Sequence, residues 1–161
     1  MDEEGDRAMK WVSHQIVTGV AVFAATDDML LTAAAMAGAI FPDKVEGNPR
    51  AGSCWLWRSR HRGWSHWPLL YVALIGLFAR VTEIAQVPPA PLADAVRIGT
   101  FFCVGALLHI LEDALCGKVP LLTPTQKVGI RLFRVGSAME YVVAGALVLI
   151  AYGVRRILFS G

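Results

Sequence analysis

Charged residues are scarce in this sequence, and its cysteines are few. Asp, Glu, Lys and Arg make up only 17% of the 161 residues, whereas hydrophobic residues make up 55%. This balance lies well beyond that of soluble domains. The net charge of +2 is too small to indicate nucleic-acid binding. The composition therefore predicts a single membrane-embedded domain over residues 1–161, with membrane lipid and no nucleic acid as its partner.

The cysteines also lack the spacing of a shared site. Cys54, Cys103 and Cys116 are odd in number and form neither a CxxC pair nor a zinc-finger pattern. A disulfide framework and a thiolate zinc site are therefore both unfavourable interpretations. A convincing signal peptide is lacking too, because residues 1–6 are acidic and no small-residue cleavage site follows an apolar core. We expect the N-terminus to be retained.

Apolar residues are abundant and lie in five blocks, at 11–26, 29–41, 67–87, 92–115 and 137–159. The last two reach the length of a membrane helix, whereas the first two are short for full crossings. Asp27 and Asp28 between the short blocks predict a tight turn in a hairpin that enters the bilayer without both arms spanning it fully. The expected fold is all-α, a polytopic membrane bundle of about five helices.

The positive residues outside the blocks indicate how the chain crosses the membrane. They precede the first block or lie between the second and third and between the fourth and fifth, at Arg7, Lys10, Lys44, Arg50, Arg58, Arg60, Arg62, Lys118, Lys127, Arg131 and Arg134. The positive-inside rule predicts that these regions are cytoplasmic. Arg155 and Arg156 fall on the opposite side if all five blocks cross. Either they snorkel to that interface or one block does not cross.

Seven polar residues then fall at the cytoplasmic ends of the predicted helices. Because neighbouring helices run in opposite directions, random placement would divide such residues between the two faces. The seven are His14, Asp43, His61, His66, His109, Asp113 and Glu140. Their convergence predicts a site at one membrane face.

His109 and Asp113 are four residues apart in a helical block, so both side chains lie on one helix face about one turn apart. Imidazole nitrogen and carboxylate oxygen are ordinary ligands of zinc and of other divalent transition metals. The competing interpretation is that Asp113 faces water at a helix end while His109 makes one buried hydrogen bond. Polar residues in membrane helices are candidates for function, which keeps the metal hypothesis open.

The segment HRGWSHW at 61–67 places two histidines just before an apolar helix. Gly63 allows a tight turn, so His61 and His66 could face a common point. Arg62 has a planar fork suited to phosphate, and Ser65 can donate a hydrogen bond to an anion or cap the helix. The alternative for Arg62 is a topology determinant beside anionic headgroups.

Three further candidates are weak when taken singly. Asp43 follows Pro42, which is expected to end the second helix and expose the carboxylate. His14 alone is as readily a packing residue with one interhelical hydrogen bond. Glu140, near the start of the last block, is either a further ligand or general base or an interfacial acid.

Taken in order, these elements resemble the YdjM-like family of membrane-bound metal-dependent hydrolases. The matching elements run along most of the chain: His14, FPD ending at Asp43, HRGWSH at 61–66, and HILED at 109–113 with Gly117 and Pro120 nearby. Members typically show an early His and PDxD-type, HRxxTH-type and HxxxD elements, and motif order relates them to the all-helical zinc-dependent phospholipase C and nuclease proteins. The resemblance implies as metal ligands His14, Asp43, His61, His66, His109 and Asp113.

This chain differs from that pattern at two positions. Val45, with Glu46 next to it, stands where a second Asp is typical, and Ser65 replaces the usual Thr. Ser65 keeps the hydroxyl group. Because this Asp is missing, the number of divalent ions in the centre, one or two, stays open. Zinc is the expected metal.

A metal-bound water would give a hydroxide nucleophile near neutral pH, and phosphoester hydrolysis is the preferred chemistry. On this hypothesis Arg62 and Ser65 hold the phosphate, while Asp43, Asp113 or Glu140 orients the water or acts as general base. A site on the cytoplasmic side of a bacterial inner membrane predicts a phospholipid or lipid-linked phosphate as substrate.

Two other functions fit the same residues. A non-catalytic membrane protein could use metal or a histidine network only to fasten its helices, since structural zinc sites are closed by four protein ligands. A metal or proton transporter needs polar residues at several depths, whereas helix midsections such as 142–152 are almost wholly apolar. We therefore rank the transporter third.

Overall fold

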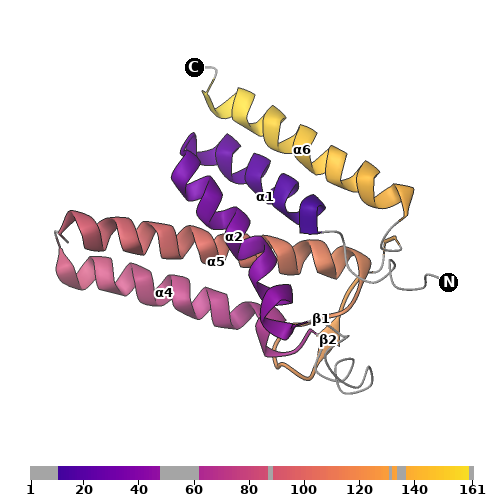
Figure 1. Ribbon diagram of the computed structural model, residues 1–161, viewed down its shortest axis with the longest axis horizontal. Coiled ribbons are helices and arrows are strands. Elements are labelled where there is room, and N and C mark those ends of the chain that lie inside the picture. Colours follow the sequence, from indigo (N-terminus) through magenta and orange to yellow (C-terminus); the bar gives the residue numbers. More distant parts are fainter. Residues whose placement is uncertain (1–10, 48–61, 87–88, 131, 134–136, 160–161) are drawn as a thin grey trace.

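The computed structural model describes residues 11–47, 62–86, 89–130, 132–133 and 137–159. The described chain is helical almost throughout (Figure 1), which confirms the predicted all-α bundle. Its α-helices are α1 (Trp11–Thr26), α2 (Met29–Glu46), α4 (Pro68–Ala85), α5 (Ala90–Cys116) and α6 (Ala138–Phe159). A short 3-10 helix, η2 (Trp64–His66), precedes α4. The strands β1 (Val119–Pro120) and β2 (Lys127–Val128) form a small antiparallel hairpin after α5, which the sequence did not predict.

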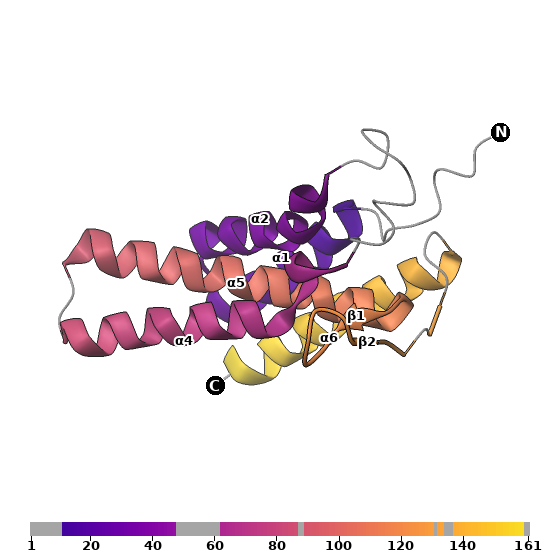
Figure 2. The same ribbon diagram turned by 90° about the horizontal axis from the view of Figure 1, so that it is seen from below.

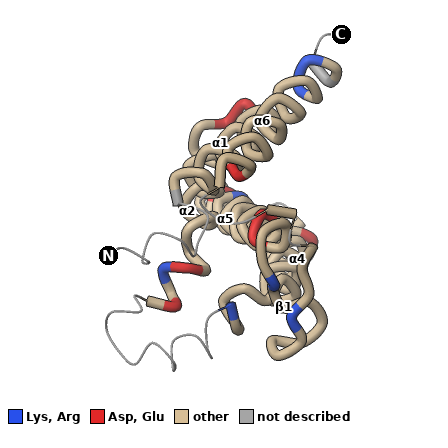
Figure 3. The backbone as a smooth tube through the Cα atoms, turned by 90° about the vertical axis from the view of Figure 1, so that its right-hand side faces the viewer, with Lys and Arg blue, Asp and Glu red and all other residues tan. Residues whose placement is uncertain are grey.

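Three helices in the described part are long and apolar enough to cross a membrane, namely α4, α5 and α6. The apolar part of α1 is shorter, and α2 is not among the candidate spans. The predicted shortness is found for α1, which has 16 residues, but not for α2, which at 18 residues is as long as α4. Most of the described chain is uncharged (Figure 3), and the charged residues of the helices stand nearer to the helix ends than to their middles, as the hydrocarbon core requires.

The turn between α1 and α2 is as tight as predicted. Asp27 adopts a positive φ of 54°, and Asp28 caps α2 by accepting hydrogen bonds from the backbone N–H groups of Leu30 at 2.9 Å and Leu31 at 3.1 Å. Aspartate suits both positions, because it tolerates the left-handed region and its side chain satisfies the free amides of a helix start. Helices α1 and α2 therefore pack against each other as a hairpin.

The two aspartates of this turn also pair with arginines at the end of the bundle opposite to the predicted site. Arg155 on α6 pairs with Asp27 at 2.8 Å, and Arg97 on α5 lies 3.4 Å from Asp28. Arg155 additionally donates to the backbone carbonyl of Phe23 at 3.2 Å. These ion pairs account for a basic residue at the end of the bundle opposite to the predicted site.

The hairpin is fixed to the rest of the bundle by α2, which crosses α5 (Figure 1). Two glycines allow the backbones to touch. A Cβ atom on Gly38 would lie 1.9 Å from the carbonyl oxygen of Phe102, and one on Gly105 would lie 1.9 Å from that of Ala35. Small residues at a helix crossing are the usual means of close packing in membranes, where lipid tails remove the hydrophobic drive between helices.

On the other side of α5, α4 runs antiparallel to it, as Figures 1 and 2 both show. The contact is filled by a buried cluster that includes Tyr71, Cys103, Ala106, Ile110 and Val119. On the opposite side of the bundle, α6 packs along α1. Helix α5 is thus the central element, and its C-terminal end lies among the N-terminal ends of α1 and α4 and the C-terminal end of α2.

One local prediction was wrong. Pro42 does not end α2, which continues for another turn to Glu46, and Pro42 itself is buried. Proline inside a helix removes one backbone hydrogen bond. The contacts of the following turn with residues 62–66 and with α5 compensate for that loss. Asp43 is therefore a helical residue aimed at the interior of the bundle rather than an exposed carboxylate behind a helix end.

Candidate metal centre

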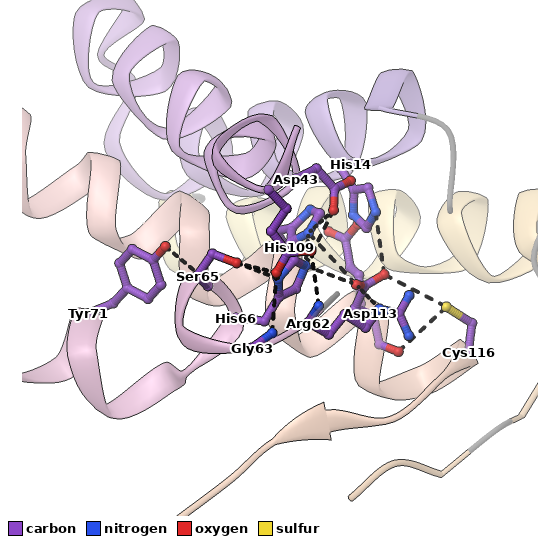
Figure 4. A network of polar contacts seen from close by, with 12 residues as sticks. His14, Asp43, Arg62, Gly63, Ser65, His66, Tyr71, His109, Asp113 and Cys116 are labelled. Atoms are coloured by element: carbon purple, nitrogen blue, oxygen red, sulfur yellow. Dashed lines mark hydrogen bonds and ion pairs between the residues drawn. The ribbon is translucent and has the colours of Figure 1, made fainter. Parts of the chain in front are cut away.

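Four of the predicted ligands meet at one end of the bundle. Asp43 on α2, His66 on η2, and His109 and Asp113 on α5 each offer a ligand atom, and these atoms all lie within 4.8 Å of one another (Figure 4). The convergence inferred from helix direction is thus found in three dimensions. His61 lies outside the described residues, so its predicted role as a ligand stays a prediction.

The separations between the donor atoms suit a small cation. His66 Nε2 lies 3.3 Å from His109 Nε2, 3.3 Å from Asp43 Oδ1 and 3.5 Å from Asp113 Oδ2. His109 Nε2 lies 3.6 Å from the same Asp43 oxygen and 3.8 Å from the same Asp113 oxygen. Tetrahedral zinc with nitrogen and oxygen ligands at about 2.0–2.1 Å requires neighbouring donors about 3.4 Å apart. The described side chains are close to that geometry.

The burial of these groups also favours a bound cation. His66 and His109 are fully buried, and Asp113 is nearly so. Asp43 Oδ2 is buried with no hydrogen-bond partner among the described residues. A buried carboxylate oxygen without a partner costs free energy unless a cation or a donor approaches it. A divalent ion among the four side chains would supply that missing interaction.

His14 lies beside this group rather than within it. Its Nδ1 atom is 2.6 Å from Glu112 Oε2, and its Nε2 atom is 3.8 Å from Asp113 Oδ1. The imidazole ring is fully buried and stands against the His109 ring, with centroids 4.1 Å apart. His14 therefore faces the second oxygen of the Asp113 carboxylate, which is a position from which it could join the centre.

Arg62 is also part of the site. Its Nε atom lies 2.9 Å from Asp113 Oδ2, and its guanidinium passes over the end of α5, where a Cβ on Gly117 would lie 1.9 Å from one terminal nitrogen. Gly117 thus leaves the space in which the guanidinium lies. The structure directs Arg62 toward the predicted ligands rather than toward the bilayer surface.

Ser65 and Glu140 occupy different surroundings. The Ser65 hydroxyl donates to Glu46 Oε1 and lies 3.0 Å from His66 Nδ1, so it is directed at a neighbouring acid. Glu140 is fully buried and accepts a hydrogen bond from the Ser13 hydroxyl at 3.2 Å, which joins α6 to α1. Glu140 does not belong to the group of four that could hold a metal.

Sequence reasoning missed two acids that contact the predicted ligands. Glu46 lies 3.0 Å from His66 Nδ1, and Glu112 lies 2.6 Å from His14 Nδ1. The helical spacing of the sequence could have indicated both acids. Glu46 is three residues after Asp43 and Glu112 is three residues after His109, so each acid shares a helix face with a predicted ligand.

The charges around His66 predict how metal binding depends on pH. Burial lowers the pKa of His66, but hydrogen bonds with Asp113, Asp43 and Glu46 outweigh burial and raise it from 6.5 to about 10. His66 is therefore protonated near neutral pH, and an entering cation must displace the proton on Nε2. Zinc affinity is expected to rise between about pH 6 and pH 8 by roughly tenfold per pH unit for each proton released. Calorimetry in two buffers of different ionisation enthalpy measures the release; an affinity independent of pH would contradict the prediction.

Three membrane-length helices, together with a cluster of histidines and aspartates at one end of α5, define a membrane protein with a possible metal-binding site. A family model described as YdjM inner membrane protein matches residues 9–160, and the chain belongs to this family. Membership of the YdjM family, which the sequence motifs indicated, is thereby confirmed. Neither the curated proteins nor the solved structures gave a match to the chain.

Proposed function

We propose that this protein is a membrane-bound metal-dependent hydrolase that acts on a phosphoester of a lipid or lipid-linked substrate. The observation that carries the proposal is the convergence of Asp43, His66, His109 and Asp113 in a buried group with metal-ligand spacing. Mixed nitrogen and oxygen donors favour zinc among the common divalent ions. When bound there, such an ion supplies an acidified water and polarises a phosphoryl oxygen.

The surrounding side chains support phosphate chemistry. Arg62 lies 2.9 Å from Asp113, and its guanidinium can exchange that carboxylate for a phosphate with the same planar fork. Asp43 or Asp113 is placed to accept a proton from a water at the centre. Ser65 would bind phosphate only if its hydroxyl turned away from Glu46, and Glu140 would act as base only from outside the group of four.

The location of the site supports a lipid substrate. The four residues lie at the C-terminal ends of α2 and α5 and just before α4, where the candidate span α4 begins and the candidate span α5 ends. That level corresponds to the headgroups of a bilayer. The basic residues of the same connections favour a cytoplasmic orientation by the positive-inside rule. A phospholipid or lipid-linked phosphate is the substrate that meets such a site without leaving the membrane.

Turnover is tested with purified protein in detergent, stripped of metal and then given Zn²⁺, Mn²⁺ or Mg²⁺. The substrates are phosphatidylglycerol in mixed micelles and a soluble nitrophenyl phosphodiester. Arg62→Lys is expected to retain metal but to lower kcat/KM by at least about tenfold, because lysine keeps the charge and loses the bidentate fork. Lys127→Arg, a variant in β2, serves as the control. Wild-type turnover by Arg62→Lys would show that the Arg62 side chain does not bind the phosphate through its bidentate fork.

A structural metal centre is the second candidate, because four protein ligands are the number that closes a structural zinc site. The same experiment separates the two functions. Stoichiometric bound zinc without hydrolysis of either substrate would favour the structural role. Absence of bound metal from the wild-type protein would contradict both.

A further inference from the structure

Two histidines at this end of the bundle are held in the same way by acids from different elements. Glu46 on α2 contacts His66 through Nδ1 at 3.0 Å, and Glu112 on α5 contacts His14 through Nδ1 at 2.6 Å. In both rings the opposite nitrogen, Nε2, faces an aspartate of the group of four. His66 Nε2 is 3.3 Å from Asp43, and His14 Nε2 is 3.8 Å from Asp113.

The arrangement determines which nitrogen of each ring can bind a cation. An ionised carboxylate only accepts hydrogen bonds, so the nitrogen that it contacts must carry the hydrogen. With Glu46 and Glu112 ionised, Nδ1 of His66 and of His14 is the donor to its glutamate. When the ring is neutral, the lone pair is left on Nε2, which is the atom that faces the aspartates. A carboxylate behind the ring also makes the imidazole a stronger ligand.

Glu46 fixes the position of its histidine as well as the tautomer. Its carboxylate accepts hydrogen bonds from the backbone N–H groups of Arg62 at 3.0 Å and Gly63 at 3.2 Å, and from the Ser65 hydroxyl. The turn that leads into η2 is thus wrapped around one side chain. Because His66 follows directly, the orientation of its ring depends on this acid.

Glu112 has a simpler environment. Oε2 contacts His14, whereas Oε1 is buried and has no hydrogen-bond partner among the described residues. The carboxylate lies in the turn of α5 that also holds His109 and Asp113. Burying a further acid beside Asp113 is costly unless positive charge is nearby. A cation held by Asp113 and by Nε2 of His14 would supply that charge.

We propose that Glu46 and Glu112 are positioning residues of the metal centre, which orient His66 and His14 so that Nε2 of both rings binds the same centre as Asp43, His109 and Asp113. The inference rests on the proposed function in its metal-binding part only. It assigns His14 to the centre through Glu112, and it gives Glu46, the residue after Val45, a role behind His66 rather than as a metal ligand.

The test uses full-length protein in detergent, metal-stripped and titrated with Co²⁺ followed by visible absorption, with Zn²⁺ affinity obtained by competition. Glu46→Ala and Glu112→Ala are expected to lower affinity by about 10–100-fold each, which is the range for acids behind metal-bound histidines. The Co²⁺ bands should change in intensity and position, since one imidazole is lost or reoriented. Glu83→Ala is the matched control, because this exposed glutamate lies at the end of α4 away from the centre and pairs with Arg80.

Glutamine variants separate positioning from packing. Glu112→Gln and Glu46→Gln keep an oxygen that can accept from Nδ1–H, so each should recover most of the affinity lost in the alanine variant and restore the wild-type Co²⁺ bands. A side chain that only filled space would give no such recovery of the bands. If Glu46→Ala does not fold, the positioning role is tested with Glu46→Gln and with the alanine and glutamine variants of Glu112.

The outcomes distinguish this inference from the proposed function. Wild-type affinity and unchanged Co²⁺ bands in Glu112→Ala, with metal bound normally by the wild-type protein, would overturn the positioning role and leave metal binding intact. Bound metal without hydrolysis would overturn the hydrolase and leave the positioning role intact. A wild-type protein that binds neither Co²⁺ nor Zn²⁺ overturns both.

Discussion

Replacing His109 with alanine is expected to remove tightly bound metal from the protein. The His109 ring is fully buried, and its Nε2 atom lies 3.3 Å from that of His66 and 3.6 Å from an oxygen of Asp43. Alanine leaves an incomplete ligand set in a place with little room for a replacement. Affinity should fall by more than about 100-fold, because loss of a direct ligand exceeds the 10–100-fold effect of an outer hydrogen-bond partner. Metal content after dialysis, measured by mass spectrometry, reports the loss.

Asp113→Ala should also remove tightly bound metal, and it should in addition leave Arg62 without its ion pair to Asp113. Asp113 also pairs with Arg62 at 2.9 Å, so its removal leaves a cation facing the remaining ligands. Asp94→Ala is the control, because this exposed residue lies on the same helix near its other end. Retention of stoichiometric metal by both His109→Ala and Asp113→Ala would show that the metal is held elsewhere.

The second large effect is expected at the crossing of α2 and α5. Gly105→Val would place Cβ 1.9 Å from the backbone oxygen of Ala35, and no rotamer change can relieve a clash with backbone. The helices must separate, which also moves Asp43 on α2 away from His109 on α5. Overpacking a core costs about 1–3 kcal/mol, and a backbone clash should reach or exceed the upper value. Thermal unfolding in detergent should therefore show a large decrease in Tm.

Gly76→Val is the matched control for this variant. Gly76 is also a glycine inside a candidate membrane span, and a Cβ there would meet no atom within 4 Å. Both variants introduce the same β-branched residue into a helix, so the difference between them isolates the helix contact. Equal Tm values for the two variants would mean that α2 and α5 do not approach each other through Gly105. Weaker metal binding is expected for Gly105→Val alone.

The sequence predicted the helices and the convergence of the site for simple reasons. A membrane helix requires a long apolar block, and such blocks are visible without knowledge of their neighbours. Antiparallel helices alternate in direction, so His14, Asp43, His66 and His109 could be assigned to one end by counting crossings. The structure brings three of these, with Asp113, into a group with metal-ligand spacing and places His14 beside it.

The features that were missed depend on tertiary contacts. Pro42 was expected to end a helix because local backbone chemistry disfavours its continuation. The following turn is instead retained, and Glu46 at its end binds a segment 16 to 20 residues further along the chain. Glu112 was overlooked because it stands next to Asp113 and resembles an ordinary helix-end acid. Only the approach of α1 shows that it contacts His14.

The ion pairs at the α1–α2 turn give the bundle two unlike ends. Helix α1 has only 16 residues and α2 is not among the candidate spans, so lipid alone fixes the depth of this hairpin weakly. At the turn it is fastened by Asp27 to Arg155 and by Asp28 to Arg97. At its open end it is fastened through His14 and Asp43 to the centre on α5. The contacts at the turn are direct ion pairs, whereas a metal ion held as proposed would strengthen only the contacts at the open end. Loss of the metal would then loosen the open end of the hairpin while the turn stays attached to α5 and α6.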